Sequence, residues 1–392
     1  MEGVAMRLSF VDALRDRSVF LTGHTGFKGS WLALWLNRLG ARVTGYSLAP
    51  PNTPSNFVSS RIGGVLARSY DADVRDLAAL RAALDGCHPD LVIHLAAQAL
   101  VRRSYIDARE TFEVNVMGTV NILEALRSLK RPCAVIIVTS DKCYDNSDSD
   151  RNHTETDPLG GNDPYSASKA AAEMVTAAYR RSFFPAGDSA THGVKVASVR
   201  AGNVIGGGDW AVDRIVPDAV RALAGGETIA VRNPGSIRAW QHVLEPLSGY
   251  LTLAARMLSS DDVALCSGWN FGPSAQDEAT VEKLVDALCQ AWGRGNWRSA
   301  PAVKQFAEER TLRLSSEKAR AQLRWEPRWN FREAVERTAR WYRTYYDRPG
   351  NSTRELCLND IADYEATGAD ASDDLTFAGG ASSASSSGRM SR

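Results

Sequence analysis

Short apolar strands alternate with helix-forming stretches through the first two hundred residues, and this alternation leaves few possible folds. Strand candidates lie at 18–22, 42–46, 91–95, 134–139 and 194–199, with one more near 66–71. Strands that alternate with helices favour a parallel, doubly wound sheet with helices on both faces. The sequence therefore predicts an α/β protein built around one large parallel sheet.

Beyond Arg200 the pattern changes to loops punctuated by glycine and proline, among them I-G-G-G-D-W and R-N-P-G-S. We predict a nucleotide-binding domain over 1–200 and a smaller mixed α/β substrate lobe, mainly over 201–348. One or two strands of that lobe are expected to return to the large sheet. The extension 349–392 contains one possible helix at 351–366, and from about 367 its Gly/Ala/Ser-rich composition predicts disorder.

The composition excludes several classes of protein. Basic and acidic residues balance at 46 each, so no excess charge favours a nucleic acid or an anionic membrane as partner. No apolar run is long enough to span a bilayer, and the first residues lack the core of a signal peptide. The six cysteines show no paired ligand spacing, which predicts reduced thiols in a cytoplasmic protein without structural metal.

A glycine-rich loop links the first strand candidate to an apolar helix candidate. Gly23, Gly26 and Gly29 permit a tight turn and close approach of a pyrophosphate, and the following helix directs its N-terminus at that anion. The alternative is a glycine-rich packing turn. Phe27 also belongs to the loop, while His24 and Lys28 add unusual bulk and charge, so we expect a dinucleotide to bind weakly or exchangeably.

The end of the second strand bears on which dinucleotide binds. Residues 45–48 (G-Y-S-L) offer neither an acidic residue for a 2′-hydroxyl nor an arginine pair for a 2′-phosphate, and NAD is favoured over NADP. Further cofactor contacts are predicted near later strand ends, with Asp73 and Val74 bordering the adenine and Leu95, Ala96, Ala97 and Gln98 lining the nicotinamide. The alternative for 94–97 is plain sheet core.

Tyr165 and Lys169 lie four residues apart on a helix that Pro164 opens, so both side chains share one face. A phenol is a poor base at neutral pH. A lysine ammonium and a cationic nicotinamide nearby would lower the pKa of Tyr165, which could then take a proton from a sugar hydroxyl as hydride leaves the same carbon. The alternative is an amphipathic pair on a surface helix.

Ser140, Asp141 and Lys142 follow the apolar run 134–138 and so end a strand, where open α/β sheets bind their ligands. If Asp141 keeps its proton in a dry pocket, it can protonate a departing hydroxyl. Lys142 could remove the proton α to a ketone or stabilise the enolate as a cation. The alternatives are a capping Asp and a solvated Lys, but an acid and a base beside Tyr165 indicate elimination of water.

Several strings together resemble one family. They are G-H-T-G-F-K-G-S-W, H-L-A-A-Q, T-S-D-K-C-Y, Y-S-A-S-K, R-A-G-N-V-I-G-G-G-D-W, D-R-I-V-P and S-I-R-A-W-Q-H-V. From about residue 17 to 346 the chain resembles the extended short-chain dehydrogenase/reductase superfamily and, within it, the CDP-glucose 4,6-dehydratase family. The resemblance implies a Rossmann-type fold, bound NAD, oxidation of CDP-glucose at C4, loss of water across C5 and C6, and hydride return to C6. The product would be CDP-4-dehydro-6-deoxy-D-glucose, which leads to deoxysugars of lipopolysaccharide O-antigen.

The resemblance also implies residue roles. Ser140 would bind the 4-hydroxyl, Asp141 would be the acid at C6, and Tyr165 the base at C4. Lys142 stands where dehydratases for other nucleotides carry Glu as the C5 base, so the identity of that base stays open. Asn115 and Thr139 join the predicted cofactor set, and the predicted substrate set is Ser104, Asn203, Arg214 and Arg238.

The resemblance finally implies self-association through two helices of the large domain, as a homodimer or homotetramer. Phe112, Val116, Val120, Leu123 and Leu126 recur at helical spacing and would be core or dimer contact. Two other functions remain open. One is a 4-epimerase or a dehydratase for another nucleotide sugar; the other is a non-catalytic NAD-binding protein.

Overall fold

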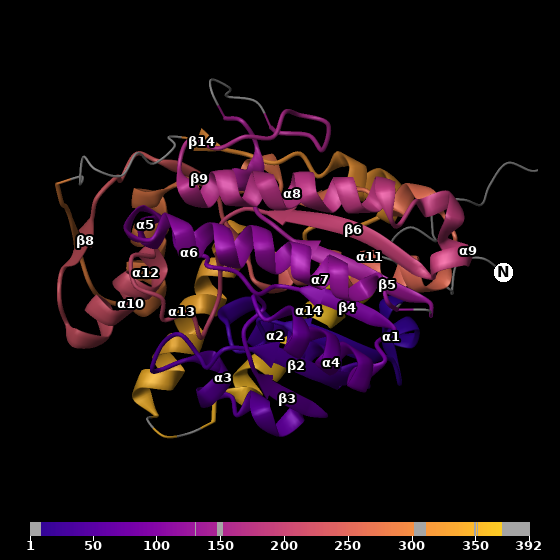
Figure 1. The fold of residues 1–392 in the computed structure, drawn as a ribbon. Helices are drawn as coiled ribbons and strands as arrows, with labels where there is room; N and C mark the ends of the chain where they lie inside the picture. The colour runs from indigo at the N-terminus through magenta and orange to yellow at the C-terminus, as the bar shows by residue number, and fades with distance from the viewer. Residues whose placement is uncertain are drawn as a thin grey trace, which may run out of the picture.

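A seven-stranded, wholly parallel sheet forms the centre of the molecule (Figure 1). The computed structural model describes residues 9–129, 131–146, 152–301, 311–348, 350 and 352–370. Across the sheet the strands run β11 (Gly268–Phe271), β6 (Val194–Ala201), β5 (Cys133–Val138), β4 (Leu91–His94), β1 (Ser18–Thr22), β2 (Arg42–Ser47) and β3 (Arg68–Asp71). The chain order reverses between β1 and β4, which confirms the predicted doubly wound sheet.

Six of these strands lie within two residues of the positions predicted from the apolar runs. The inner strands β1, β4 and β5 were recognisable because both faces of the sheet are covered, so these strands are apolar along most of their length. The edge strand β3 (R-S-Y-D) is largely exposed and gives a weaker signal. In β5, Ala134, Ile136 and Val138 face one core, while Cys133, Val135 and Ile137 face the other.

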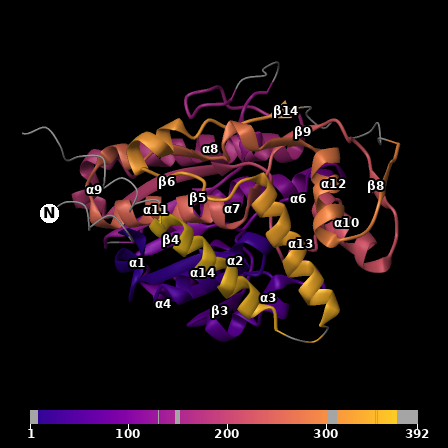
Figure 2. The same ribbon diagram turned by 180° about the vertical axis from the view of Figure 1, so that it is seen from behind.

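Helices cover both faces of the sheet. On the side nearer the viewer in Figure 1 lie α4 (Leu77–Cys87), α7 (Gly118–Leu126) and α8 (Pro164–Ser182). The opposite side, seen in Figure 2, carries α1 (Ser9–Leu14), α2 (Phe27–Arg38), α11 (Leu244–Ser259) and α14 (Arg354–Asp370). Short segments near the carboxyl ends of the strands are α3 (Asn56–Ser59), α5 (Val101–Ile106), α6 (Ala108–Phe112) and a π-helical turn, Glu113–Met117. A 3-10 turn, Ile62–Val65, precedes β3, and α9 (Ser189–His192) precedes β6.

The remaining elements form a smaller mixed region at the left of Figure 1. Its strands are β7 (Val204–Ile205), β8 (Ile229–Val231), β9 (Ile237–Ala239), β10 (Gln241–His242), β12 (Glu278–Thr280), β13 (Trp297–Ser299) and β14 (Thr311–Leu312). Its helices are α10 (Ile215–Gly225), α12 (Val281–Trp292) and α13 (Phe331–Asp347). β11 comes from this part of the chain and pairs with β6 in the large sheet, whereas the domain boundaries themselves stay a prediction.

The stripe at 112–126 divides between core and surface. Leu123 and Leu126 are buried, Val116 and Val120 are half-buried, and Phe112 is exposed. Among the described residues, no helix is long and apolar enough to cross a bilayer. The same residues contain no cluster of three His, Cys, Asp or Glu side chains arranged to hold a metal, and the six cysteines are unpaired.

Helix α14 folds back onto the far face of the sheet beside α2 (Figure 2). Tyr364 donates to Glu245 on α11 at 2.7 Å, and Glu365 accepts from Trp35 at 2.9 Å and from Arg38 at 3.0 Å, both on α2. The helix continues to Asp370, so its last turn overlaps the start of the segment predicted to be disordered from about 367, which stays a prediction. The rest of that prediction, 371–392, lies outside the described residues.

A chain that ends at Gly350 should therefore lose much of its stability. Removing α14 exposes the apolar surface around Trp35 and leaves the buried Glu245 without the Tyr364 hydroxyl, a loss of about 5 kcal/mol or more. We expect the midpoint of thermal unfolding to fall by at least about 10 °C, measured by differential scanning calorimetry. A chain that ends at Asp370 is the control, and it should match the full chain in stability and activity. Equal unfolding midpoints for all three chains would refute a structural role of α14.

Candidate active site

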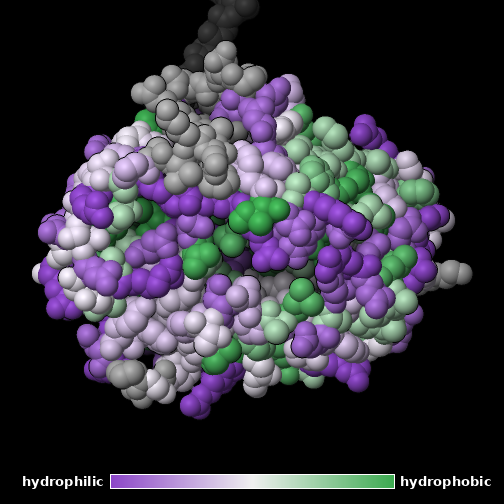
Figure 3. Space-filling view, turned by 60° about the vertical axis from the view of Figure 1, so that its left-hand side comes forward, coloured by the Kyte–Doolittle hydropathy of each residue, from purple (hydrophilic) through white to green (hydrophobic). Residues whose placement is uncertain are grey.

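One large cavity of about 1120 Å³ lies along the carboxyl ends of the parallel strands. Loops that follow β1, β2, β3, β4, β5 and β6 line one side, and α10 with the segment around β8 and β9 lines the other. Figure 3 brings the left side of Figure 1 forward and shows a hollow near the centre of this face, with mainly hydrophilic residues around it. The site therefore occupies the place where doubly wound sheets bind ligands.

The glycine loop is shaped by close backbone contacts that a side chain would block. Gly23 has a φ of +74°, and a Cβ there would lie 2.7 Å from the Ala96 nitrogen. A Cβ on Gly29 would lie 2.1 Å from the Gly23 carbonyl oxygen. Gly26 precedes α2 without a side-chain cap, and the first turn of α2 has no acidic residue. The first amides of α2 can therefore bind an anion, as a pyrophosphate site requires.

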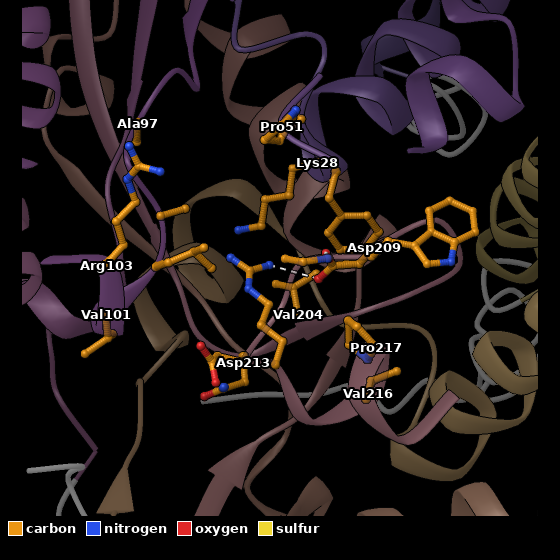
Figure 4. A pocket seen from close by; sticks show the side chains of 18 of the residues that line it. Lys28, Pro51, Ala97, Val101, Arg103, Val204, Asp209, Asp213, Val216 and Pro217 are labelled. Atoms are coloured by element: carbon orange, nitrogen blue, oxygen red, sulfur yellow. Dashed lines mark hydrogen bonds and ion pairs between the residues drawn. The ribbon is translucent and has the colours of Figure 1, made fainter. Parts of the chain in front are cut away.

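His24 and Lys28 point in different directions. The His24 ring is buried behind the loop, hydrogen-bonded to Ser69 at 2.9 Å and packed over Gly45, and it does not line the cavity. Burial lowers the pKa of His24 to about 4, so the ring is neutral at pH 7. Lys28 does line the cavity, and Figure 4 shows its side chain among those that surround the cavity. Burial lowers the pKa of Lys28 to about 8.

The later strand ends supply most of the other predicted cofactor contacts. The predicted residues that line the cavity here are Asp73, Val74, Leu95, Ala96, Ala97, Gln98 and Thr139. Asn115 does not line it. Its side chain instead accepts from the Gln98 backbone N–H at 2.8 Å and donates to the Gln98 carbonyl at 3.0 Å, so it fixes a residue that does line the cavity.

Ser140, Asp141 and Lys142 all line the cavity at the end of β5. Ser140 caps the 3-10 turn Asp141–Cys143, and its hydroxyl donates to the Asp141 carboxylate at 2.8 Å. Asp141 is only 6 % exposed, and this burial raises its pKa, although Lys142, the Ser140 hydrogen bond, Arg238 and Lys28 oppose the rise. A carboxyl with a raised pKa can keep a proton to donate.

Tyr165 and Lys169 lie on the first two turns of α8, which starts at Pro164 behind the Asp163 cap. Burial raises the pKa of Tyr165 to about 12, while the Ser140 hydrogen bond and the charge of Arg214 act to lower it. The prediction that Lys169 and a bound nicotinamide lower this pKa stays a prediction, and Arg214, on the other side of the cavity, is a cation that acts in the same direction. Lys169 donates to the Val138 carbonyl at 3.5 Å, and burial lowers its pKa to about 8.

Three of the four predicted substrate residues line the cavity: Asn203, Arg214 and Arg238. Arg214 forms an ion pair with Asp209 at 2.9 Å, drawn as a dashed line in Figure 4. Ser104 does not line it. Its hydroxyl donates to the Val101 carbonyl at 2.6 Å and accepts from the Tyr165 backbone N–H at 3.2 Å, so it supports the start of α8.

The sequence interpretation missed a second group of charges at the cavity. Asp213 adopts a left-handed backbone with φ of 63° and binds Arg102 at 2.9 Å and Arg232 at 3.1 Å. All three residues line the cavity, and the Asp213–Arg102 pair links the smaller region to α5. These three residues are far apart in the sequence, so no local pattern predicts that they meet. Only Asp213 lay in a string that we had singled out, D-R-I-V-P.

Comparison with known proteins agrees with this geometry. A family model described as GDP-mannose 4,6 dehydratase matches residues 20–338. This chain belongs to that family. The family match covers both the sheet and the cavity, and it confirms the resemblance read from the sequence strings.

Relatives of this family member include sugar-nucleotide dehydratases and epimerases. The CDP-glucose 4,6-dehydratase of Salmonella typhimurium is 46 % identical over 350 residues, which cover 89 % of this chain and 96 % of that protein. The dTDP-glucose 4,6-dehydratase DesIV of Streptomyces venezuelae, solved with NAD, is 26 % identical, with a TM-score of 0.70 over 83 % of this chain and 97 % of that one. A UDP-glucose 4-epimerase of Thermus thermophilus, also solved with NAD, is 25 % identical, with a TM-score of 0.69 over 83 % and 98 %.

Proposed function

We propose that this protein is an NAD-dependent CDP-glucose 4,6-dehydratase that converts CDP-D-glucose into CDP-4-dehydro-6-deoxy-D-glucose. The observation that carries the proposal is the meeting of two reactive groups in one cavity. Asp141 and Lys142 at the end of β5 face the same space as Tyr165 and Lys169 on α8. The 46 % identity to the Salmonella protein supports CDP-glucose as the substrate.

The residues suit the two halves of such a reaction. Tyr165 takes the proton of the sugar 4-hydroxyl, which Ser140 orients, during oxidation at C4. The ketone at C4 acidifies the proton at C5, and Asp141 then protonates the hydroxyl that leaves from C6. Lys142 either removes the C5 proton or stabilises the enolate as a cation.

NAD fits the residues on the other side of the cavity. The backbone cradle at Gly23 and Gly29 and the uncapped start of α2 suit its pyrophosphate. When bound, NAD supplies a hydride acceptor for C4 and a donor for C6, so no net redox change occurs. The strand β2 ends at Ser47, whose hydroxyl bonds Thr25 at 2.8 Å, and this end offers no acidic residue to the ribose. We retain the expectation of weak NAD binding and of preference for NAD over NADP.

Replacing Gly29 with alanine should weaken NAD binding by at least about tenfold, a change of about 1.4 kcal/mol. The added Cβ, 2.1 Å from the Gly23 carbonyl, must push the loop away from its present path. Calorimetric titration with NAD measures the effect. Gly63→Ala is the matched control, because its Cβ would meet its nearest atom at 3.6 Å and lie outside the cavity. Unchanged affinity in Gly29→Ala would mean that the loop does not cradle the pyrophosphate.

Substrate binding is assigned to the basic side of the cavity. Arg214 and Arg238 can make paired charged hydrogen bonds to a diphosphate, and Asn203 lines the same cavity. Arg214 is held ready by Asp209, which fixes the guanidinium. Ser104 acts indirectly, by holding the Tyr165 backbone.

Two other functions are weighed on the same residues. A 4-epimerase needs Tyr165 and Lys169 but no acid at C6, and the buried Asp141, whose pKa burial raises, therefore favours a dehydratase. A dehydratase for another nucleotide sugar uses the same chemistry, so the choice of CDP rests on the Salmonella relative. A purely NAD-binding protein would not need Ser140 and Asp141 beside Tyr165.

We also propose a cytoplasmic homodimer or homotetramer that serves deoxysugar synthesis for lipopolysaccharide O-antigen. Exposed apolar side chains on neighbouring helices support self-association: Phe112 on α6, Met117 next to α7 and Met174 on α8 are 39 %, 49 % and 53 % exposed. Sedimentation velocity distinguishes a dimer from a tetramer, and a monomer at micromolar concentration would refute the proposal.

The decisive assay incubates the purified protein with CDP-glucose, with and without added NAD. A 4-keto sugar is detected by its absorbance in alkali, and the product mass is compared with products from UDP-, dTDP- and GDP-sugars. A keto product lighter than CDP-glucose by one water is the expected result. No loss of mass from any of these sugars would point to an epimerase or a binding protein, and loss only from another nucleotide sugar would change the substrate.

A further inference from the structure

A buried ion pair lies directly beneath the reactive residues. Glu173 stands one helical turn after Lys169 on α8 and is only 3 % exposed. Its two carboxylate oxygens accept from Arg200 on β6 at 2.9 and 2.8 Å, a paired contact. Arg200 is itself 4 % exposed. Glu173 and Arg200 do not line the cavity, so neither is placed to touch a ligand there.

The same carboxylate binds the strand that carries the other reactive residues. The Thr139 hydroxyl donates to Glu173 at 2.5 Å, and the Ser198 hydroxyl on β6 donates at 2.7 Å. Thr139 immediately precedes Ser140 and Asp141. One side chain thus joins α8, which holds Tyr165, to the end of β5 and to β6.

Arg200 extends this connection to the turn after Asp141. Its guanidinium donates to the Tyr144 hydroxyl at 2.5 Å and lies over the Tyr144 ring, 4.9 Å from the centroid. Tyr144 in turn donates to Asn270 on β11 at 2.8 Å. The 3-10 turn with Asp141 and Lys142 is therefore fixed at both ends, by Thr139 before it and by Tyr144 after it.

Given the proposed function, we infer that Glu173 is a positioning residue, which sets the separation between the Tyr165–Lys169 pair and the Ser140–Asp141 pair and supplies the negative charge that keeps Lys169 cationic. The charged or titratable groups that act on Lys169 support the claim that Glu173 helps to keep it cationic. Cys143 and, after it, Glu173 raise its pKa, and Glu173 is the carboxylate of the two, one helical turn from Lys169. Lys28 and His94 are the groups on which the charge of Lys169 in turn acts. Since burial alone lowers the pKa of Lys169, removing the Glu173 charge lowers it further.

The test uses the cofactor-free full chain and a readout that needs no turnover. Cyanate carbamylates only the unprotonated amine, so the rate at Lys169, followed by peptide mass spectrometry from pH 6 to 10, reports its pKa. In Glu173→Gln we expect the rate at pH 7 to rise by about fivefold, as a decrease of one unit from a pKa of about 8 predicts. In Glu173→Asp, which keeps the charge but shortens the reach, we expect the parent pH dependence.

Turnover of CDP-glucose then tests the positioning role. Both variants should lower kcat by about tenfold or more with little change in KM, because substrate contacts stay intact while reacting groups move apart. Asp360→Asn is the matched control. Asp360 is a buried carboxylate that binds Arg337 at 3.2 Å and Arg340 at 2.5 Å, away from the cavity. It should lower the unfolding midpoint without moving the Lys169 profile.

Each outcome decides the inference. The inference is overturned if Glu173→Gln has the same pH dependence of carbamylation at Lys169 and the same kcat as the parent protein. It is also overturned if Asp360→Asn shifts the Lys169 pH dependence as much as Glu173→Gln does. If Glu173→Gln does not fold, the double variant Glu173→Gln with Arg200→Leu removes the whole ion pair. It should lower kcat as Glu173→Gln does, and a parent kcat in it overturns the positioning role. If the parent protein does not dehydrate CDP-glucose, the proposed function is wrong. The cyanate measurement needs no turnover, so it still tests whether Glu173 raises the pKa of Lys169.

Discussion

Replacing Tyr165 with phenylalanine should abolish oxidation at C4, and with it every later step. The phenol is the group that takes the 4-hydroxyl proton, and general-base catalysis of this kind contributes about 10²- to 10⁴-fold. We expect a loss of at least about 10³-fold in keto-sugar formation, with no NADH signal at 340 nm in a single turnover. NAD affinity should change little, since Lys169 and the glycine loop remain.

The pH dependence of this step has a definite sign. Burial raises the pKa of Tyr165 to about 12, so the phenolate fraction grows as pH rises, and the oxidation rate should grow with it. Tyr250→Phe is the control: Tyr250 is fully buried, and its hydroxyl has no hydrogen-bond partner within the part of the chain that the structure describes. Parent activity in Tyr165→Phe would remove Tyr165 from the mechanism.

Replacing Asp141 with asparagine should separate the two halves of the reaction. The amide cannot protonate the C6 hydroxyl, so elimination slows by about 10²- to 10³-fold. Oxidation at C4 depends on Tyr165 and continues, and NADH should therefore accumulate on the enzyme in a single turnover. The amplitude of that absorbance is the internal control for intact binding.

The role of Asp141 as an acid also predicts that the rate of elimination falls at high pH. Burial raises the pKa of Asp141, so the carboxyl is protonated at low pH and loses its proton as pH rises through that raised value. Elimination should consequently slow at high pH while oxidation accelerates, which gives a bell-shaped profile for the whole reaction. An Asn variant that turns over at the parent rate would show that Asp141 is no general acid.

The positions of the sheet strands and of the reactive residues were predictable because they depend on local pattern. Apolar runs mark strands buried on both faces, and residues directly after such strands reach the cavity. This reasoning placed Ser140, Asp141 and Lys142 correctly at one end of the sheet. The spacing of Tyr165 and Lys169 placed both on one face of α8 for the same reason.

The direction of single side chains was not predictable. His24, Ser104 and Asn115 stand in the right segments but turn away from the cavity, toward Ser69, Val101 and Gln98. Contacts between distant segments were also invisible, since Asp213 meets Arg102 and Arg232 only after the smaller region folds over α5. Arg214 likewise acts to lower the pKa of Tyr165 from across the cavity, and no helical spacing predicts that approach.

The docking of α14 on α2 also affects how the protein is made. Helix α2, which begins at the dinucleotide loop, is covered by α14, whose residues emerge from the ribosome after the rest of the described chain. The outer edge of β6 stays unpaired until β11 has emerged. A nascent chain therefore cannot complete the packing of α2 until α14 has emerged. Until then the apolar side of α2 and an unpaired strand edge are open to chaperones or to aggregation. The emergence of α14, rather than that of the early strands alone, thus completes the surroundings of the helix that begins at the dinucleotide loop.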